Sequence, residues 1–153
     1  MVRYFIGSAA HKLDAKGRVS LPADYREVLK TQDSADVFVI VPAGAGVPFH
    51  LAFSRQGHER LIERIAGMTF ANPAEKRETR RRFISEARPI SVEEGGRFVL
   101  SKELREGLGL DKEVQFVGDG ETFQIWQPSA HAKAEAAAAE AAAPAEIDFA
   151  GLV

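Results

Sequence analysis

The sequence contains no cysteine, which excludes disulfide bonds, thiolate nucleophiles and cysteine-ligated zinc. No hydrophobic run approaches the length needed to span a bilayer, so we expect no association with a membrane. Residues 1–10 hold one arginine and a short apolar patch, which does not match the charged start and long apolar segment of a signal peptide. These absences, together with a length of 153 residues, predict one compact cytoplasmic protein.

Positive charge is scarce for a protein that binds nucleic acid. The formal net charge is −2, whereas nucleic-acid-binding domains usually carry an excess of lysine and arginine. The charge is unevenly distributed, since the segment from Ser129 onward has Lys133 as its single cation against four acidic residues. The rest of the chain is close to neutral. Any affinity for DNA must therefore come from local clusters of cations or from several subunits that act together.

Sequence motifs for catalysis, metals and cofactors are also absent. There is no G-x-S-x-G, Walker or dinucleotide-binding fingerprint. The four histidines are scattered without the spacing of a metal site. They are His11, His50, His58 and His131, and we expect His11 to lie in a strand. Adjacent carboxylates such as Glu93-Glu94 are common in turns, so we expect no enzyme activity, no cofactor, no bound metal and no small-molecule substrate.

The chain contains an internal repeat, which must be recognised before local elements are assigned. When Gly17-Arg18 is aligned with Gly96-Arg97, further identical or similar residues fall in register. These pairs are Asp14 with Glu93, Leu21 with Leu100, Asp24 with Glu103, Arg26 with Arg105 and Leu29 with Leu108. Each copy has the pattern of a hairpin, a short helix and a second hairpin.

The two copies occupy residues 1–53 and 88–128. In the first copy a β-rich start is predicted at residues 3–6, strands at 11–13, 18–21, 37–41 and 49–53, and a helix at 22–29. Pro22 suits the first position of that helix. In the second copy strands are predicted at residues 90–92, 97–100, 114–118 and 122–126, and a helix at 101–108. Asp119-Gly120 has the composition of a tight hairpin turn.

The residues between and after the copies are predicted to be helical. Residues 54–87 hold two helices, of which the first is capped by Ser54 and ended by Gly67. Asn72-Pro73-Ala74-Glu75 is a typical start for the second, with a capping side chain, an early proline and a glutamate in the first turn. Residues 129–153 form an alanine-rich tail with little apolar area to bury, which we expect to be flexible and peripheral.

The strongest candidate for a functional site is the turn Asp14-Ala15-Lys16-Gly17, followed by Arg18. Asp14 can cap the turn and Gly17 allows a positive φ. Arg18 would then project from a fixed position, which suits bidentate contact with O6 and N7 of guanine, and Lys16 is a candidate for contact with phosphate. The alternative is an internal Asp–Arg pair that only stiffens the turn, and for one isolated turn that alternative is the simpler one.

The second copy repeats this turn with Glu93, Gly96 and Arg97 in place of Asp14, Gly17 and Arg18. Two pseudo-symmetric arginines on one body match the two-fold arrangements that are common in DNA recognition. The duplication therefore favours a DNA-binding role.

A cationic helix at residues 76–82 is a weaker candidate. It carries Lys76, Arg77, Arg80, Arg81 and Arg82. Residues 77, 80 and 81 share one face at helical spacing, so contact with phosphate groups is geometrically possible. A solvated helix face, or one that pairs with glutamates of a neighbouring subunit, is the favoured interpretation.

The sequence resembles the MraZ family, which belongs with the AbrB-like swapped-hairpin proteins. The resemblance covers residues 4–126 and rests on four motifs. These are Phe5-Ile6-Gly7, the pattern H-x-L-D-x-K-G-R-V-x-L-P that begins at His11, the second Gly-Arg block, and Phe123-Gln124-Ile125-Trp126. It implies an α+β fold in which a duplicated AbrB-like swapped-hairpin β-barrel carries short flanking helices.

The resemblance also implies a function. Members of the family assemble as rings and bind short tandem repeats in the promoter of the division and cell-wall gene cluster that contains their own gene. They act on its transcription, chiefly as repressors. For this chain the resemblance implies double-stranded DNA as the partner, a ring-like homo-oligomer, and a cytoplasmic location on the nucleoid.

The resemblance assigns DNA contact to the first turn, at Asp14, Lys16, Gly17 and Arg18. The second turn departs from the pattern, because Glu93 is a longer acid, Gly95 precedes Gly96, and Ser101 stands where the first copy has Pro22. These changes loosen the turn, so we expect Arg18 to be the main contact and Gly96-Arg97 a secondary one.

An AbrB-like antitoxin, or another oligomeric interaction protein without promoter specificity, is the alternative function. An antitoxin of this kind usually has one hairpin unit and a tail with apolar anchors, whereas here the unit is doubled and the tail is mostly alanine. Only four residues of the tail could anchor a partner, namely Ile147, Phe149, Leu152 and Val153.

Overall fold

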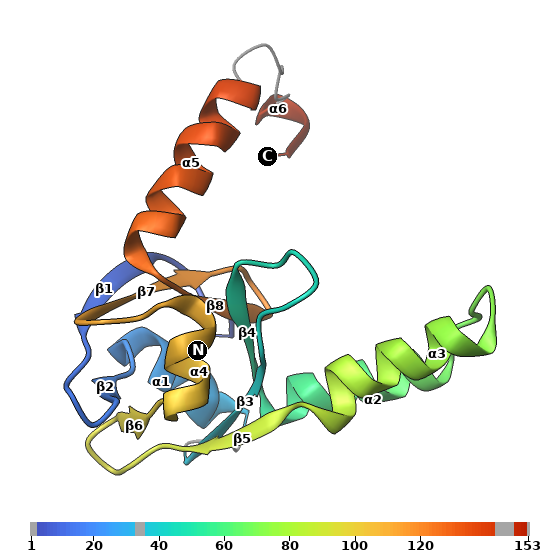
Figure 1. Cartoon of the computed structure of the whole chain (residues 1–153), viewed down its shortest axis with the longest axis horizontal. Helices are drawn as coiled ribbons and strands as arrows, with labels where there is room; N and C mark the ends of the chain where they lie inside the picture. Colours follow the sequence, from blue (N-terminus) through green and yellow to red (C-terminus); the bar gives the residue numbers. More distant parts are fainter. Residues whose placement is uncertain (1–2, 33–35, 143–148, 153) are drawn as a thin grey trace.

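The computed structural model describes residues 3–32, 36–142 and 149–152. They form a mixed α+β fold in which an antiparallel sheet and a short two-stranded ribbon are flanked by helices (Figure 1). The α+β class expected from the sequence is therefore confirmed. No helix of the described residues combines the length and the apolar character that a membrane span requires.

The first copy of the repeat forms four strands and one helix. They are β1 (Ser8–Lys12), β2 (Arg18–Ser20), α1 (Ala23–Thr31), β3 (Val37–Val41) and β4 (Phe49–Ser54). The residues at helical spacing, Tyr25, Val28 and Leu29, are the buried face of α1. Of the predicted β-rich start, Phe5 forms an isolated bridge with Gly120.

The second copy repeats this order. Its elements are β5 (Arg88–Ser91), β6 (Arg97–Val99), α4 (Lys102–Leu108), β7 (Glu113–Gly118) and β8 (Thr122–Trp126). Ser101, which replaces the proline of the first copy, caps α4 by accepting a hydrogen bond from the Leu104 N–H at 3.2 Å. The predicted turn at Asp119-Gly120 is confirmed, since Gly120 has a φ of +84° and Asp119 donates to the Thr122 carbonyl at 2.9 Å.

The strands of the two copies pair with one another. The large sheet is antiparallel, in the order β1-β7-β8-β4-β3-β5, and β2 pairs with β6 in a separate sheet that we call the ribbon. This order is unchanged when every strand is replaced by its counterpart in the other copy. In the ribbon, Val19 lies opposite Phe98, its own counterpart, so the ribbon lies at the centre of this symmetric arrangement.

Two expectations differ from the structure. The strands at residues 11–13 and 18–21 were expected to form a hairpin, but β1 pairs with β7 and β2 with β6. The turn between them is nevertheless closed by hydrogen bonds from the Gly17 N–H to the Asp14 carbonyl and from the Asp14 N–H to the Arg18 carbonyl, at 3.0 and 3.1 Å. The large sheet ends at β1 and β5, so among the described residues the strands do not close into a hydrogen-bonded barrel.

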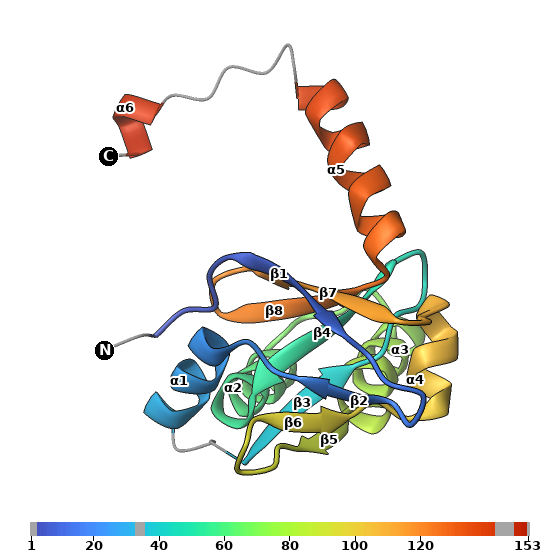
Figure 2. The same ribbon diagram turned by 90° about the vertical axis from the view of Figure 1, so that its left-hand side faces the viewer.

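The core fixes the orientation of the ribbon. Val19 and Phe98 point inward and are 2% and 1% exposed, and the Phe98 ring packs edge-on against Phe38 at a centroid distance of 5.1 Å. Because side chains alternate along a strand, the neighbouring residues of both strands must face solvent. Figure 2 shows the ribbon on the opposite side of the body from β7 and β8.

The residues between the copies form an arm of two helices, α2 (Arg55–Ala66) and α3 (Pro73–Arg80), that projects from the body (Figure 1). Both predicted caps are present. Ser54 accepts from the Gly57 N–H at 3.0 Å, and Asn72 accepts from the Glu75 N–H at 2.8 Å. A short π-helix, η1 (Arg81–Ser85), which the sequence did not predict, continues α3 and leads into β5.

The alanine-rich segment forms the helix α5 (Pro128–Ala142), followed by the short helix α6 (Phe149–Leu152). α5 points away from the body (Figure 2), and its base is held where the His131 ring packs against Trp126 at a centroid distance of 5.3 Å. Leu152, a candidate anchor residue, is exposed. The candidate anchors Ile147 and Val153 lie outside the described residues.

Candidate nucleic-acid interface

The first turn holds Arg18 through the carboxylate of Asp14. Oδ1 of Asp14 accepts hydrogen bonds from the backbone N–H groups of Lys16 and Arg18, both at 2.9 Å, and Oδ2 accepts from Nε of Arg18 at 2.6 Å. The bond from the Arg18 backbone, followed by that from its side chain, holds the pKa of Asp14 below its usual value. The carboxylate is therefore ionised at neutral pH and fixes the guanidinium at its Nε edge.

Gly17 is required by the geometry of this turn. Its φ is +85°, a conformation that residues with a β-carbon rarely adopt. A β-carbon here would also lie 2.3 Å from the carbonyl oxygen of Leu100. The two segments of the chain are this close because the Leu100 N–H donates to the Gly17 carbonyl at 2.8 Å. The glycine thus allows the turn of the first copy to contact the second copy directly.

The second turn has the same backbone hydrogen bonds as the first, but its acid and arginine do not form the same ion pair. Glu93 and Arg97 are joined by a backbone hydrogen bond of 2.8 Å, and Gly96 has a φ of +88°. Within the described part of the chain, however, the Arg97 side chain forms no ion pair with Glu93 or any other acid. The longer acid thus coincides with a guanidinium that has no acidic partner among the described residues.

Arg18 and Arg97 share the outer face of the ribbon. The outward residues of the two strands are Arg18, Ser20, Arg97 and Val99. Ser20 lies opposite Arg97 and Val99 opposite Arg18, so the two arginines occupy diagonal positions. The Arg18 side chain is 46% exposed. The internal Asp–Arg pair considered from the sequence is therefore present, and it holds an arginine that still faces solvent.

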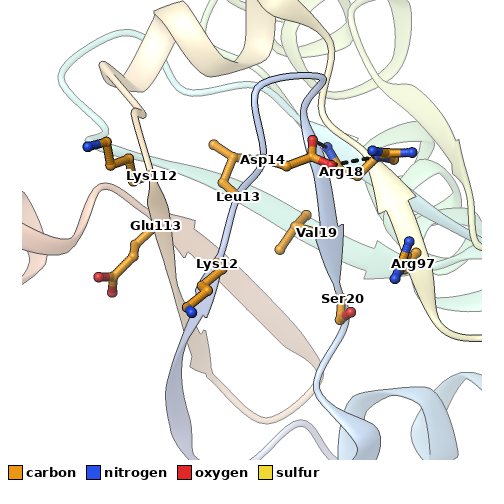
Figure 3. Close-up of a pocket in the computed structure, with 9 residues that line it drawn as sticks. All are labelled: Lys12, Leu13, Asp14, Arg18, Val19, Ser20, Arg97, Lys112 and Glu113. Carbon is orange, nitrogen blue, oxygen red and sulfur yellow. Dashed lines mark hydrogen bonds and ion pairs between the residues drawn. The ribbon is translucent and has the colours of Figure 1, made fainter.

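A groove of about 680 Å³ lies beside this face (Figure 3). It is lined by Lys12, Leu13, Asp14, Arg18, Val19, Ser20, Arg97, Lys112 and Glu113. Four cations thus face two carboxylates, one of which is already bonded to Arg18. The structure brings together Asp14, Arg18 and Arg97 of the predicted site, while Lys16 is exposed in the adjoining turn.

Lys12 and Lys112 were not identified from the sequence. Lys12 occupies a variable position of the motif that begins at His11, so nothing in the pattern marks it. Lys112 lies in the second copy, and only the pairing of β1 with β7 brings it beside the first turn. The tertiary structure was therefore needed to recognise the basic side of the groove.

The cationic helix is less suited to bind phosphate than its composition indicates. Arg81 forms ion pairs with Glu78 and Glu86 of its own chain, which raise the pKa of the Arg81 guanidinium. The guanidinium of Arg82 lies 5.6 Å from the centroid of the Phe83 ring. Three cations, Lys76, Arg77 and Arg80, remain exposed. These contacts favour the solvated helix face expected from the sequence, with partners supplied within the chain.

His50 and His11 form hydrogen bonds with backbone groups of the fold. His50 is buried, where Nδ1 accepts from the Ala43 N–H at 2.8 Å and Nε2 donates to the Leu104 carbonyl at 2.7 Å. Burial lowers the pKa of His50. His11 lies in β1, as predicted, and bonds through Nδ1 to the Ser20 carbonyl. Among residues 3–32, 36–142 and 149–152, no group of three or more acidic or histidine side chains is arranged to hold a metal.

Comparison with known proteins agrees with the repeat and with the resemblance. The family model described as "MraZ protein, putative antitoxin-like" matches the chain twice, at residues 4–81 and 83–150. A protein of Ruegeria sp. strain TM1040, named transcriptional regulator MraZ, is 36% identical over 146 residues, which cover 92% of this chain and 87% of the relative.

A protein of the same name from Burkholderia vietnamiensis is 38% identical over 138 residues, which cover 89% of this chain and 92% of the relative. The similarity thus extends over nearly the full length of both sequences. The match of one family model to each half also agrees with the paired arrangement of the two copies. The chain belongs to the MraZ family of transcriptional regulators.

Proposed function

We propose that the protein is a sequence-specific DNA-binding regulator that reads bases with the outer face of the ribbon. The observation that carries this proposal is the Arg18 side chain, which is exposed and yet fixed by Asp14 through Nε at 2.6 Å. Its Nη atoms have no partner among the described residues and remain free to donate. A guanidinium held in this way loses little rotamer freedom when it binds the edge of a guanine.

The other predicted residues support the same surface. Gly17 and Gly96 place the two turns close to the ribbon, and Lys16 is exposed next to Arg18, where it can contact a phosphate group. Arg97 lines the groove with Arg18 and is a second donor for a base edge. We assign Arg18 the main role, because an acidic partner fixes it, whereas no acid among the described residues pairs with Arg97.

We further propose that each copy is an AbrB-like swapped-hairpin unit and that the two units together form one barrel-like body. The exchange of strands between the copies supports this proposal. Reciprocal backbone hydrogen bonds across the centre support it too, from the Leu21 N–H to the Gly96 carbonyl at 2.9 Å and from the Leu100 N–H to the Gly17 carbonyl at 2.8 Å.

The proposed target is the promoter of the division and cell-wall gene cluster that contains the protein's own gene, where the protein acts as a repressor on tandem repeats. A ring-like homo-oligomer bound to the nucleoid in the cytoplasm would meet several repeats at once. Membership of the MraZ family supports this assignment. The charge supports it as well, since a subunit with a formal net charge of −2 gains affinity when several subunits bind one DNA molecule.

The alternative is an antitoxin-like protein that binds a partner protein through its C-terminal segment. The description of the matching family model, which includes the words antitoxin-like, favours keeping this second function. Of the candidate anchors, Leu152 has an exposed side chain that such a partner could contact. An alanine helix with few large apolar residues offers little area for a stable protein interface, which favours the regulator.

A gel shift with the DNA upstream of the gene tests the proposed function. Arg18→Ala should lower the affinity by at least about fivefold, because a bidentate contact with a base contributes roughly 1–3 kcal/mol. Arg77→Ala, which removes an exposed arginine from the arm, is the matched control and should bind like the wild type. Both variants should keep the oligomeric state and melting temperature. Normal binding by Arg18→Ala would exclude the ribbon as the reading surface.

A further inference from the structure

We propose that the DNA backbone runs along one side of the ribbon only, over Lys12 and Lys112, so that each subunit binds DNA in a single orientation. The inference rests on the DNA-binding function proposed above. It adds two phosphate-contacting residues to the site. It also makes the two sides of the nearly symmetric body differ in their interaction with DNA.

Backbone contacts show which residues of the two copies are equivalent. The Leu13 N–H donates to the Lys112 carbonyl at 2.8 Å, and the Val92 N–H donates to the Asp36 carbonyl at the same distance. Leu13 precedes the first turn as Val92 precedes the second. Lys112 on one side of the ribbon therefore corresponds to Asp36 on the other, with the opposite charge.

The strand registers give a second pair of equivalent residues. Lys12 lies opposite Glu113 where β1 meets β7, and Ser91 lies opposite Val37 where β5 meets β3. Lys12 is the last residue of the edge strand β1, and Ser91 is the last residue of the edge strand β5. Each directly precedes the turn region of its copy. Lys12 therefore corresponds to Ser91, and the second side again lacks the cation.

The two turns extend this difference. The first turn contains Lys16, whereas the equivalent position of the second turn is Gly95, which follows Glu94. One side of the ribbon thus presents three lysines, Lys12, Lys16 and Lys112, against two acids, Glu113 and Asp14, of which Asp14 is already paired with Arg18. The other presents three acids, Asp36, Glu93 and Glu94, and has no lysine at the equivalent positions. A phosphate backbone is attracted to the first side and repelled by the second, because charge contacts with phosphates dominate the affinity of proteins for DNA.

The lysines of the first side are available and well placed. Lys12 and Lys112 are exposed, line the groove that contains Arg18, and form no ion pair among the described residues (Figure 3). Their backbones are fixed next to the ribbon. The bond from His11 to the Ser20 carbonyl ties β1 to β2 immediately before Lys12, and the bond from Leu13 holds Lys112.

A polarity of this kind determines how the subunits can lie on DNA. Arg18 and Arg97 are nearly symmetric, so bases alone would allow a subunit to bind in either orientation. The three lysines contact the backbone in only one of the two orientations. Successive subunits in a ring then require binding sites that point in the same direction, so direct repeats should bind more tightly than the same sequences in inverted order.

Exchange of the flanking residues tests the phosphate contacts. The double variant Lys12→Ser, Lys112→Asp places the residues of the second side on the first. Its matched control, Lys102→Ser with Lys133→Asp, makes the same change in charge at exposed lysines outside the groove. Binding of full-length protein to a fluorescent duplex from its own upstream DNA is measured by anisotropy over a range of salt concentrations.

The groove variant should lose at least about tenfold in affinity, and the slope of log K against log salt should fall by about 2 per bound subunit, since each phosphate contact contributes about 0.9. The control should match the wild type. Equal affinity and slope for groove variant and control would overturn the inference while the proposed function stands. If the wild type itself shows no preference for this DNA, the proposed function fails, and the inference fails with it.

Cleavage of DNA from labelled turns tests the polarity with every lysine intact, and so does not depend on the folding of the groove variant. The chain has no cysteine, so Ala15→Cys and Glu94→Cys each create a single attachment point, in equivalent exposed positions of the two turns, for an iron chelate that cuts nearby DNA. The label at residue 15 should cut the backbone at one end of each repeat, and the label at residue 94 should cut several-fold less. Equal cutting from both turns would overturn the proposed direction.

Discussion

Arg26 donates a hydrogen bond from Nη2 to the carbonyl oxygen of Glu94 at 2.9 Å, and so connects the helix of the first copy to the turn of the second. The relation is reciprocal, since Nη1 of Arg105 in the second copy lies 3.5 Å from the carbonyl of Ala15. Each arginine also packs over the turn glycine of the other copy. A β-carbon on Gly96 would lie 2.7 Å from Cδ of Arg26.

Arg26→Ala should destabilise the protein by about 1–2 kcal/mol, because it removes a charge-assisted hydrogen bond and the packing of the arginine stem on Gly96. Arg26→Lys should be intermediate, since lysine keeps the charge but lacks the planar guanidinium. Urea unfolding measures both effects. Lys30→Ala, which changes an exposed residue of the same helix, is the control. An unchanged midpoint for Arg26→Ala would show that this contact does not stabilise the turn.

Gly17→Ala should cost at least about 2 kcal/mol, because the residue has a positive φ and the new β-carbon would press on the Leu100 carbonyl. Gly95→Ala is the matched control in the other turn, where an added β-carbon meets no atom within 4 Å. It should change stability by less than about 0.5 kcal/mol. Thermal unfolding separates the two, and equal melting temperatures would contradict the requirement for glycine at residue 17.

His50 should make the fold sensitive to mild acid. Burial holds the pKa of His50 below the value of 6.5 expected in the unfolded chain, so the unfolded state takes up a proton first as the pH falls. The stability that neutral His50 contributes is complete above pH 6.5. It is lost as the pH falls from 6.5 toward the lower pKa of the folded state. Unfolding in urea at successive pH values measures this loss.

His50→Leu provides the control for that measurement. The variant should be less stable at pH 8 by roughly 2–4 kcal/mol, because the Ala43 N–H and the Leu104 carbonyl each lose a buried partner. It should also lose less stability than the wild type between pH 7 and pH 5, since only the wild type protonates this side chain. Parallel pH profiles for the two proteins would assign the acid sensitivity to other groups.

Asp14→Asn should weaken DNA binding without changing the fold. The amide oxygen can still accept the backbone N–H groups of Lys16 and Arg18, but the charge that fixes the guanidinium is lost. We expect a several-fold loss of affinity in an anisotropy titration. Glu93→Gln is the matched control, because Arg97 does not pair with that acid, and it should bind at least as well as the wild type. Equal affinity of both variants would show that Arg18 does not need its acidic partner.

The number of repeats should control affinity more strongly than their sequence context. A duplex with several repeats should bind at least about a hundredfold more tightly than one with a single repeat, because contacts after the first become intramolecular. Scrambled repeats of the same length and charge provide the control for nonspecific binding. Equal affinity for one repeat and for several would remove the need for a multivalent assembly.

The sequence alone determined the local features of this protein. The helix caps at Ser54 and Asn72 and the turn that presents Arg18 depend on residues close together in the chain. Their chemistry is local, since a capping side chain or a positive φ acts within a few residues. The family motifs occur in the same local segments. For this reason the first turn and its arginine could be located without a structure.

Only the tertiary structure decided which strands meet. The pattern of residues 11–21 fits a hairpin whose strands pair with each other and one whose strands are exchanged with the other copy. In the structure β1 pairs with β7 and β2 with β6, and this pairing across the copies buries Val19 and Phe98 in one shared core. Hydrophobic alternation fixes which face of a strand is buried but not the identity of its neighbour. The cluster of Lys12 with Lys112 follows from that pairing, and for this reason the charge difference between the two sides of the ribbon could not be read from the sequence.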